Sequence, residues 1–133
     1  MTRIGLASLC LAVGACVIHA GPQPNEFIPA FSGTGITATL AVADRGIIGE
    51  LLEVRDNSVV VLTTGRVVLV PFTNIAHGTF AHTDVTITNG VFPTSDDMTE
   101  VRMLSRFPYG IPPDALRRLL ASRQQDSLAV IQP

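Results

Sequence analysis

The stretch GELLEVRDNSVVVLTTGRVVLVPF, residues 49–72, decides the fold class of this chain. With the two residues before it, the stretch contains three apolar runs, which cover residues 47–54, 58–63 and 66–70. Short runs rich in Val and Leu are typical of strands. The turn residues Asp56-Asn57 and Thr64-Gly65 separate the runs, so the pattern predicts an antiparallel meander. Gly49 lies within the first run, where a bulge or a sharp bend is expected.

Further elements are expected on both sides of this meander. Residues 36–42 alternate between apolar and mostly polar positions, and this two-residue period is typical of a half-buried strand. Asp44-Arg45-Gly46 is the expected turn from this strand into the meander. After Pro71, residues 72–75 are expected to form one helical turn, and residues 76–80 are expected to return to extended structure.

The order of these elements resembles that of the small β-barrels of the SH3-like and Sm-like class. The resemblance depends on a glycine in a bent first strand, two tight hairpins, a strand that ends at Pro71, and one turn before another short strand. It covers residues 46–80, about a quarter of the chain, and includes no signature residues. Barrels of this class bind peptides, RNA or other subunits along strand edges and loops. The resemblance therefore implies a shape and no particular function.

The chain beyond Phe80 is expected to add a hairpin to the barrel. Residues 83–88 alternate as a strand does, and Asn89-Gly90 is a strong hairpin signal. Residues 93–100 are expected to form a polar loop. Residues 101–107 alternate apolar residues with arginines, which favours a strand, although Leu104 breaks the alternation.

A helix is expected in the sequence IPPDALRRLLASRQQD, residues 111–126. Pro113 and Asp114 suit the first turn of a helix, where a missing N–H costs little and a carboxylate meets the positive end of the helix dipole. One face of the helix is apolar, because three leucines lie at helical spacing: Leu116, Leu119 and Leu120. Three turns are not stable alone in water, so we expect this helix to dock on the open end or on one face of the barrel. Residues 127–133 are expected to add an edge strand or to fray.

The predicted fold is therefore mainly β. Residues 36–107 are expected to form an SH3-like or Sm-like small antiparallel barrel with an added hairpin. Residues 108–133 are expected to form the C-terminal helix and its tail. Residues 21–35, which are rich in Pro, Gly and small polar residues, are expected to be a linker.

The first 20 residues, MTRIGLASLCLAVGACVIHA, have the layout of a secretory signal. Arg3 precedes an apolar run, residues 4–18, which is short for a membrane span and ends before Gly21-Pro22. This layout predicts export from a bacterial cell. The alternative is that these residues form a core element of a cytosolic protein.

Two cleavage positions are open for this signal. Ala20 allows a cut before Gly21, which would leave 133 − 20 = 113 residues as a soluble chain. Val13-Gly14-Ala15-Cys16 resembles the lipobox of bacterial lipoproteins, and this resemblance implies a lipid on Cys16. The predicted location is the periplasm or the outer membrane for the anchored form, and the periplasm or the medium for the free form. A lipid at Cys16 is the only membrane contact that we predict.

The composition excludes several classes of function. Both cysteines, Cys10 and Cys16, lie in the signal, so a body cut before Gly21 has no disulfide, thiolate metal site or cysteine nucleophile. The chain has no lysine, and without Arg3 its 8 arginines oppose 11 acidic residues, a net charge of −3. Such a body lacks the basic surface that nucleic acids require. We predict no nucleic-acid partner and no cofactor.

His77, His82 and Asp84 form the one cluster with the character of metal ligands or acid/base groups. His82 and Asp84 are two residues apart, so on a strand they would share a face, whereas His77 would point to the opposite face. A zinc or nickel site needs at least three convergent ligands. We therefore expect a surface hairpin with a His–Asp hydrogen bond. A small metal-binding protein or enzyme centred on these three residues is the alternative.

The other carboxylates are expected to be solvated. Asp96, Asp97 and Glu100 lie in the polar loop and lack the ligand spacing and central glycine of a calcium loop. Glu50 and Glu53 are three residues apart, so they are expected on opposite faces of one strand as outward charges that keep the sheet soluble.

Phe107, Tyr109 and Ile111 flank the prolines before the helix and form a candidate partner-binding surface. The alternative is a hinge packed under the helix. The apolar strands of the meander also invite pairing with other strands unless their edges are covered. We therefore predict a non-catalytic binding or structural module of the cell envelope, which contacts a protein partner or associates with itself through strand edges. An Sm-like RNA binder is the alternative if the N-terminus is retained.

Overall fold

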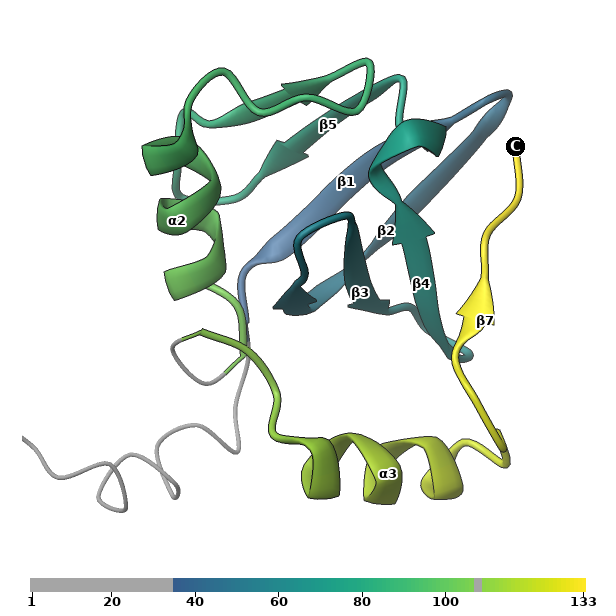
Figure 1. The fold of residues 1–133 in the computed structure, drawn as a ribbon. Coiled ribbons are helices and arrows are strands. Elements are labelled where there is room, and N and C mark those ends of the chain that lie inside the picture. Colours follow the sequence, from purple (N-terminus) through teal and green to yellow (C-terminus); the bar gives the residue numbers. More distant parts are fainter. Residues whose placement is uncertain (1–34, 107–108) are drawn as a thin grey trace, which may run out of the picture.

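The computed structural model of the chain describes residues 35–106 and 109–133. The elements of the described residues come in nearly the expected order, with strands first and a helix close to the C-terminus (Figure 1). They are β1 (Thr37–Val42), β2 (Arg45–Val54), β3 (Ser58–Leu62), β4 (Val67–Pro71), the 3-10 helix η1 (Phe72–Asn74), β5 (His77–Phe80), β6 (Thr86–Thr88), α2 (Ser95–Met103), α3 (Pro113–Ser122) and β7 (Ala129–Val130).

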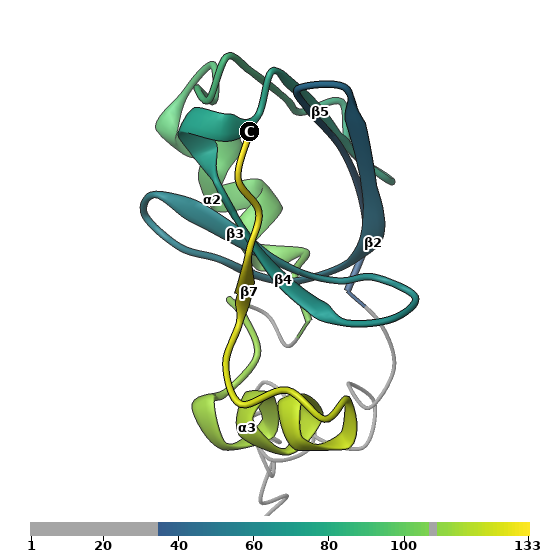
Figure 2. The same cartoon turned by 90° about the vertical axis from the view of Figure 1, so that its right-hand side faces the viewer.

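The seven strands form one mixed sheet in the order β6-β5-β1-β2-β3-β4-β7. The first four strands make the expected antiparallel meander, and β5 returns to pair antiparallel with β1. The last strand, β7, runs parallel to β4 and lies beside it in both views (Figures 1 and 2). Within the described residues no pairing joins β6 to β7, so the sheet is not closed. The mainly β class with a C-terminal helix is confirmed.

The turns of the meander are tight, as expected. The first turn lies at Ala43 and Asp44, one residue earlier than the sequence indicated, because Val42 already pairs with Arg45. The expected irregularity in the second strand is also present. The register between β2 and β3 shifts between Leu51 and Glu53, which lie beyond Gly49.

Gly49 has a different reason to be a glycine. A Cβ atom at this position would lie 2.2 Å from the carbonyl oxygen of Leu62. Close approach of the neighbouring strand, and not the bulge, therefore excludes a side chain at this point.

The sheet is apolar on both faces because both faces are covered. One core cluster lies on the face that α2 covers, and it includes Val59, Val61 and the helix residue Val101. The second cluster lies under α3 and includes Val60. The β3 strand alternates between the two clusters, which explains why residues 58–63 show no polar positions in the middle of the run.

The C-terminal helix, α3, forms and docks as expected. Pro113 begins it, Asp114 lies in its first turn, and the buried side chains are Leu116 and Leu120. The helix lies on one face of the sheet, opposite the core that contains α2 (Figure 1). Burying each leucine contributes about 1.5–3 kcal/mol, which is sufficient to hold three turns in place.

The prediction was wrong for the segment between Thr94 and Leu104. This segment was expected to be a polar loop followed by a strand, and it forms the helix α2 instead. The hydroxyl of Thr94 accepts a hydrogen bond from the amide of Asp97 at 3.0 Å and caps the helix. Val101 is its one buried residue, so the apolar pattern of a helix is almost absent from the sequence.

The expected strand at residues 83–88 is shorter than predicted. Only Thr86–Thr88 pair with β5, whereas Thr83 lies in a bend and Asp84 and Val85 belong to neither a helix nor a strand. The hairpin signal at Asn89-Gly90 is confirmed, since both residues have positive φ and Thr88 pairs with Val91 across them.

Candidate functional site

Tyr109 and Ile111, the two described residues of the expected partner-binding surface, do not share one exposed surface. Cys16 and Phe107 lie outside the described residues. Tyr109 has 60% of its surface exposed, and its amide donates to the carbonyl of Arg102 at 3.2 Å. Ile111 is buried in the cluster under α3, as the packed-hinge alternative expected. Tyr109 is therefore exposed enough to contact a partner, and Ile111 is not.

His77, His82 and Asp84 do not lie on one strand. His77 is the first residue of β5 and is exposed. His82 lies beyond the end of β5 in a turn with a positive φ of 63°, so it is not on a strand with Asp84. The expected shared face was wrong because the chain leaves the sheet at Ala81. The amide of Val85 donates to the hydroxyl of Thr83 instead of to a strand partner.

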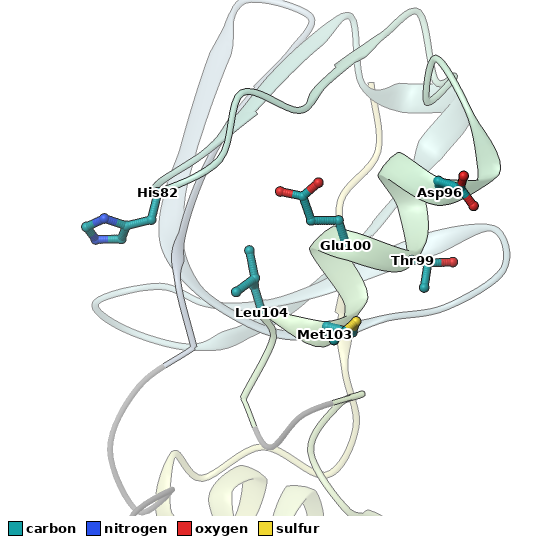
Figure 3. A pocket seen from close by; sticks show the side chains of 6 residues that line it. All are labelled: His82, Asp96, Thr99, Glu100, Met103 and Leu104. Atoms are coloured by element: carbon teal, nitrogen blue, oxygen red, sulfur yellow. The ribbon is translucent and has the colours of Figure 1, made fainter.

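A shallow depression of about 390 Å³ lies between the His82 turn and α2. Asp96, Thr99, Glu100 and Met103 line it from α2, together with Leu104, which follows the helix. The imidazole of His82 points away from the carboxylates of Glu100 and Asp96 (Figure 3). Glu100 accepts a hydrogen bond from the hydroxyl of Thr83 at 2.8 Å. No group of three His, Cys, Asp or Glu side chains within residues 35–106 and 109–133 is placed to hold a metal ion.

The acidic side chains of β2 have structural partners. Glu50 accepts two hydrogen bonds from the guanidinium of Arg106, at 2.7 and 2.6 Å, and a third from the amide of Gly35 at 2.7 Å. Its side chain is 15% exposed, so the expectation of an outward, solvated charge was wrong at this position. Glu53 pairs with Arg55 at 3.0 Å. The burial of Glu50 is explained by the bulge in β2, where the carbonyl of Leu51 accepts a hydrogen bond from the amide of Arg106. This bond holds Arg106 beside β2, so its guanidinium can reach Glu50.

The C-terminal segment covers the outer edge of β4, which is the side that faces away from β3. Because peptide groups alternate in direction along a strand, every second residue of β4 faces away from β3. Val67 and Leu69 are two of these residues, and both find partners in the C-terminal segment. Pro71 follows at the same spacing and has no N–H to satisfy. The edge of the most apolar strand is therefore closed.

The side chain of Gln125 closes the first position of this edge. The amide of Val67 donates to Oε1 of Gln125 at 2.7 Å, and Nε2 of Gln125 donates to the carbonyl of Val67 at 2.9 Å. One side-chain amide thus occupies the place that a peptide group of a neighbouring strand would take. It satisfies both main-chain groups of a fully buried residue.

The strand β7 closes the second position. Val68 pairs with Ala129 and Leu69 with Val130, and the amide of Ile131 donates to the carbonyl of Leu69 at 2.9 Å. These contacts make a parallel strand of only two residues.

Ile131 anchors the end of this strand. Its side chain is 4% exposed and belongs to the core on the α2 side of the sheet. The carbonyl of Ile131 accepts a hydrogen bond from the side chain of Asn74 at 3.0 Å, and the carbonyl of Gln132 accepts one from Arg45. The next residue back, Val130, remains 51% exposed.

This edge was predictable only in part from the sequence. An edge strand in residues 127–133 was one of two expectations, and the structure confirms it. The parallel pairing with β4 and the role of Gln125 were not expected. A glutamine that mimics a strand has no pattern in the sequence, because its partner, Val67, lies 58 residues away.

Comparison of the chain with models of protein families, with curated proteins and with solved structures gave no match. None of the described helices, η1, α2 and α3, has the length and the apolar run that crossing a membrane requires.

Proposed function

We propose that the chain is a non-catalytic module of the bacterial cell envelope that binds extended polypeptide segments along the edge of β4. The observation that carries this proposal is the way that edge is filled. A two-residue strand and one side-chain amide hold a position where a longer strand from another polypeptide could pair. Strand addition of this kind draws its affinity from main-chain hydrogen bonds and its specificity from alternate side-chain pockets.

Two sites that the resident segment fills would serve as the pockets for such a segment. Ile131 itself fills a buried apolar site at the end of the edge, and we call this site the Ile131 pocket. Leu128 is half-buried on the opposite face, against the cluster under α3. A ligand of this site therefore needs an aliphatic residue in the place of Leu128 and a large aliphatic residue three positions later, in the place of Ile131. The two residues between them must be extended, as Ala129 and Val130 are.

The arrangement of the strands supports the resemblance to SH3-like and Sm-like barrels. The order β5-β1-β2-β3-β4, with one 3-10 turn between β4 and β5, has the hairpins, the Pro-ended strand and the single turn on which the resemblance depends. Such barrels bind peptides or other subunits along strand edges, and the β4 edge is the corresponding surface of this chain. This likeness supports a shape and a mode of binding, and it identifies no partner.

Export is the second part of the proposal. Residues 1–20 direct the chain out of the cytosol, and it is either anchored by a lipid at Cys16 or released by a cut before Gly21. Intact mass of the protein recovered from cells separates the two forms. A mass that includes residues 1–20 would refute export and would favour the intracellular alternative.

Titration with a peptide tests the binding function. The peptide SLAVIQP, which repeats residues 127–133, is added to the Ile131→Ala chain and to the unaltered chain. The amide resonances of Val67 and Leu69 are followed by NMR. The substitution removes a buried side chain that is worth about 2–5 kcal/mol, so the resident strand should compete about tenfold less well or worse. We expect the peptide to bind the Ile131→Ala chain more tightly than the unaltered chain.

The matched control is the same peptide with aspartate in place of its isoleucine. A charged side chain cannot enter the Ile131 pocket without losing its hydration, so the control peptide should leave the two resonances unchanged. If SLAVIQP shifts neither resonance in either chain, the β4 edge is not a strand-binding site and the proposed function is wrong.

A further inference from the structure

We propose that the strand bound at the β4 edge is the C-terminal segment of a second copy of this chain, so that two copies exchange residues 125–133. This inference rests on the proposed function and names its partner. Exchange of an identical element between two protomers is a low-cost route to a dimer, because each contact of the monomer is made again between the copies.

The contacts of the segment are of the kind that exchange preserves. Gln125 bonds to Val67, Ile131 bonds to Leu69 and enters the core, and Asn74 bonds to the carbonyl of Ile131. Each of these joins the segment to the body of the sheet. A second copy of the segment, delivered from outside, would find the same partners at the same positions.

The connection between α3 and the segment contains a strained turn. The helix ends with the amide of Gln125 bonded to the carbonyl of Leu120 at 2.9 Å, and the amide of Gln124 bonded to the carbonyl of Ala121 at 3.0 Å. These two bonds define a Schellman motif, in which the residue at the position of Gln124 is usually glycine.

Gln124 has a φ of 57° instead of the negative φ that suits its side chain. A left-handed conformation is unfavourable for a residue with a Cβ atom. Short hinges under strain favour domain exchange, because an extended hinge releases the strain. The strain at Gln124 therefore acts in the direction of exchange and against the closed monomer.

A pair of cysteines reports directly which copy fills the edge. Leu69 and Val130 are directly opposite in the β4–β7 register and lie on the same face of the sheet. Leu69→Cys and Val130→Cys are introduced together, in the full chain with Cys10→Ser and Cys16→Ser, so that these two thiols are the only ones. The protein is concentrated, oxidised, and separated on a denaturing gel without reductant.

Exchange predicts a covalent dimer that reductant converts to monomer. The two single-cysteine variants are the matched controls. A dimer from Val130→Cys alone would mean that two β7 edges meet each other, and this result would overturn the exchange. Gln124→Gly in the double-cysteine background should lower the dimerisation constant about 5- to 30-fold, because each dimer contains two hinges.

Two other results would overturn the inference and leave the proposed function to its own test. One is a dimer, seen by sedimentation, in which the 69–130 bond lies within each chain. The other is a monomer at every concentration, with the bond again internal. In both cases the peptide titration still decides whether the β4 edge accepts a strand, so failure of the inference and failure of the function are distinguishable.

Discussion

Replacing Gln125 with alanine should open the β4 edge at one defined place. The substitution removes two hydrogen bonds, of 2.7 and 2.9 Å, from the main chain of Val67. Val67 is fully buried, so its N–H and C=O would have to find water at the edge or remain unsatisfied. A hydrogen bond is worth about 0.5–1.5 kcal/mol net, and an unsatisfied buried group costs about 1–3 kcal/mol. We expect the free energy of unfolding to fall by about 2 kcal/mol.

The measurement is urea unfolding followed by circular dichroism, with the slope of the transition checked for each variant. Gln132→Ala is the matched control, because Gln132 is exposed and contributes only its main-chain carbonyl to Arg45. It makes the same chemical change and should leave stability within about 0.5 kcal/mol of the unaltered chain. If Gln125→Ala costs no more than Gln132→Ala, the side-chain amide does not complete the sheet edge, and the account of that edge is wrong.

Three further substitutions test other parts of the structure. Gln124→Gly should raise the free energy of unfolding by about 0.5–1 kcal/mol, because relief of the left-handed strain outweighs the added freedom of glycine in the unfolded chain. A lower melting temperature for this variant would contradict the claim that Gln124 is strained. Arg106→Ala should lower the free energy of unfolding by about 1–3 kcal/mol, since it leaves the 15% exposed carboxylate of Glu50 with only the Gly35 amide as a partner. Arg118 is exposed, so Arg118→Ala is the control, and an equal effect from both substitutions would refute the role of the ion pair. Gly78→Ala should lower the free energy of unfolding by about 1–3 kcal/mol, because the new Cβ would lie 2.6 Å from the side chain of Ile87 and 2.7 Å from that of Leu40. Gly65→Ala is the control, because a Cβ there meets nothing within 4 Å, and similar urea midpoints for the two variants would contradict the close packing at Gly78.

The central meander could be predicted from the sequence because its signals are local. Valine and leucine runs with two-residue turns specify strands and their boundaries, and residues 58–62 and 67–71 lie within one residue of the predicted limits. The leucine face of α3 was also predictable, since all three leucines lie within five residues and share one helical face. These patterns depend on backbone geometry that a few neighbouring residues decide.

The remaining elements depend on contacts between distant residues. The helix α2 buries only Val101, so its amphipathic pattern is too weak to distinguish it from a loop, although the Thr94 and Asp97 cap was a usable signal. The turn at His82 separates two residues that a continuous strand would have placed together. The pairing of β7 with β4 joins residues about sixty positions apart, and no local periodicity encodes its direction.

Native-state hydrogen exchange at Val67 and Ile131 tests most directly whether the β4 edge is closed by a segment that can leave it. The amide of Val67 is bonded to Gln125 and that of Ile131 to Leu69, so one opening of the C-terminal segment should expose both. We expect these two amides to exchange with a common opening free energy, a few kcal/mol below that of the β3 amides, which report global unfolding. If Val67 and Ile131 exchange only when β3 exchanges, the edge never opens in the folded protein, and neither strand binding nor strand exchange can occur there.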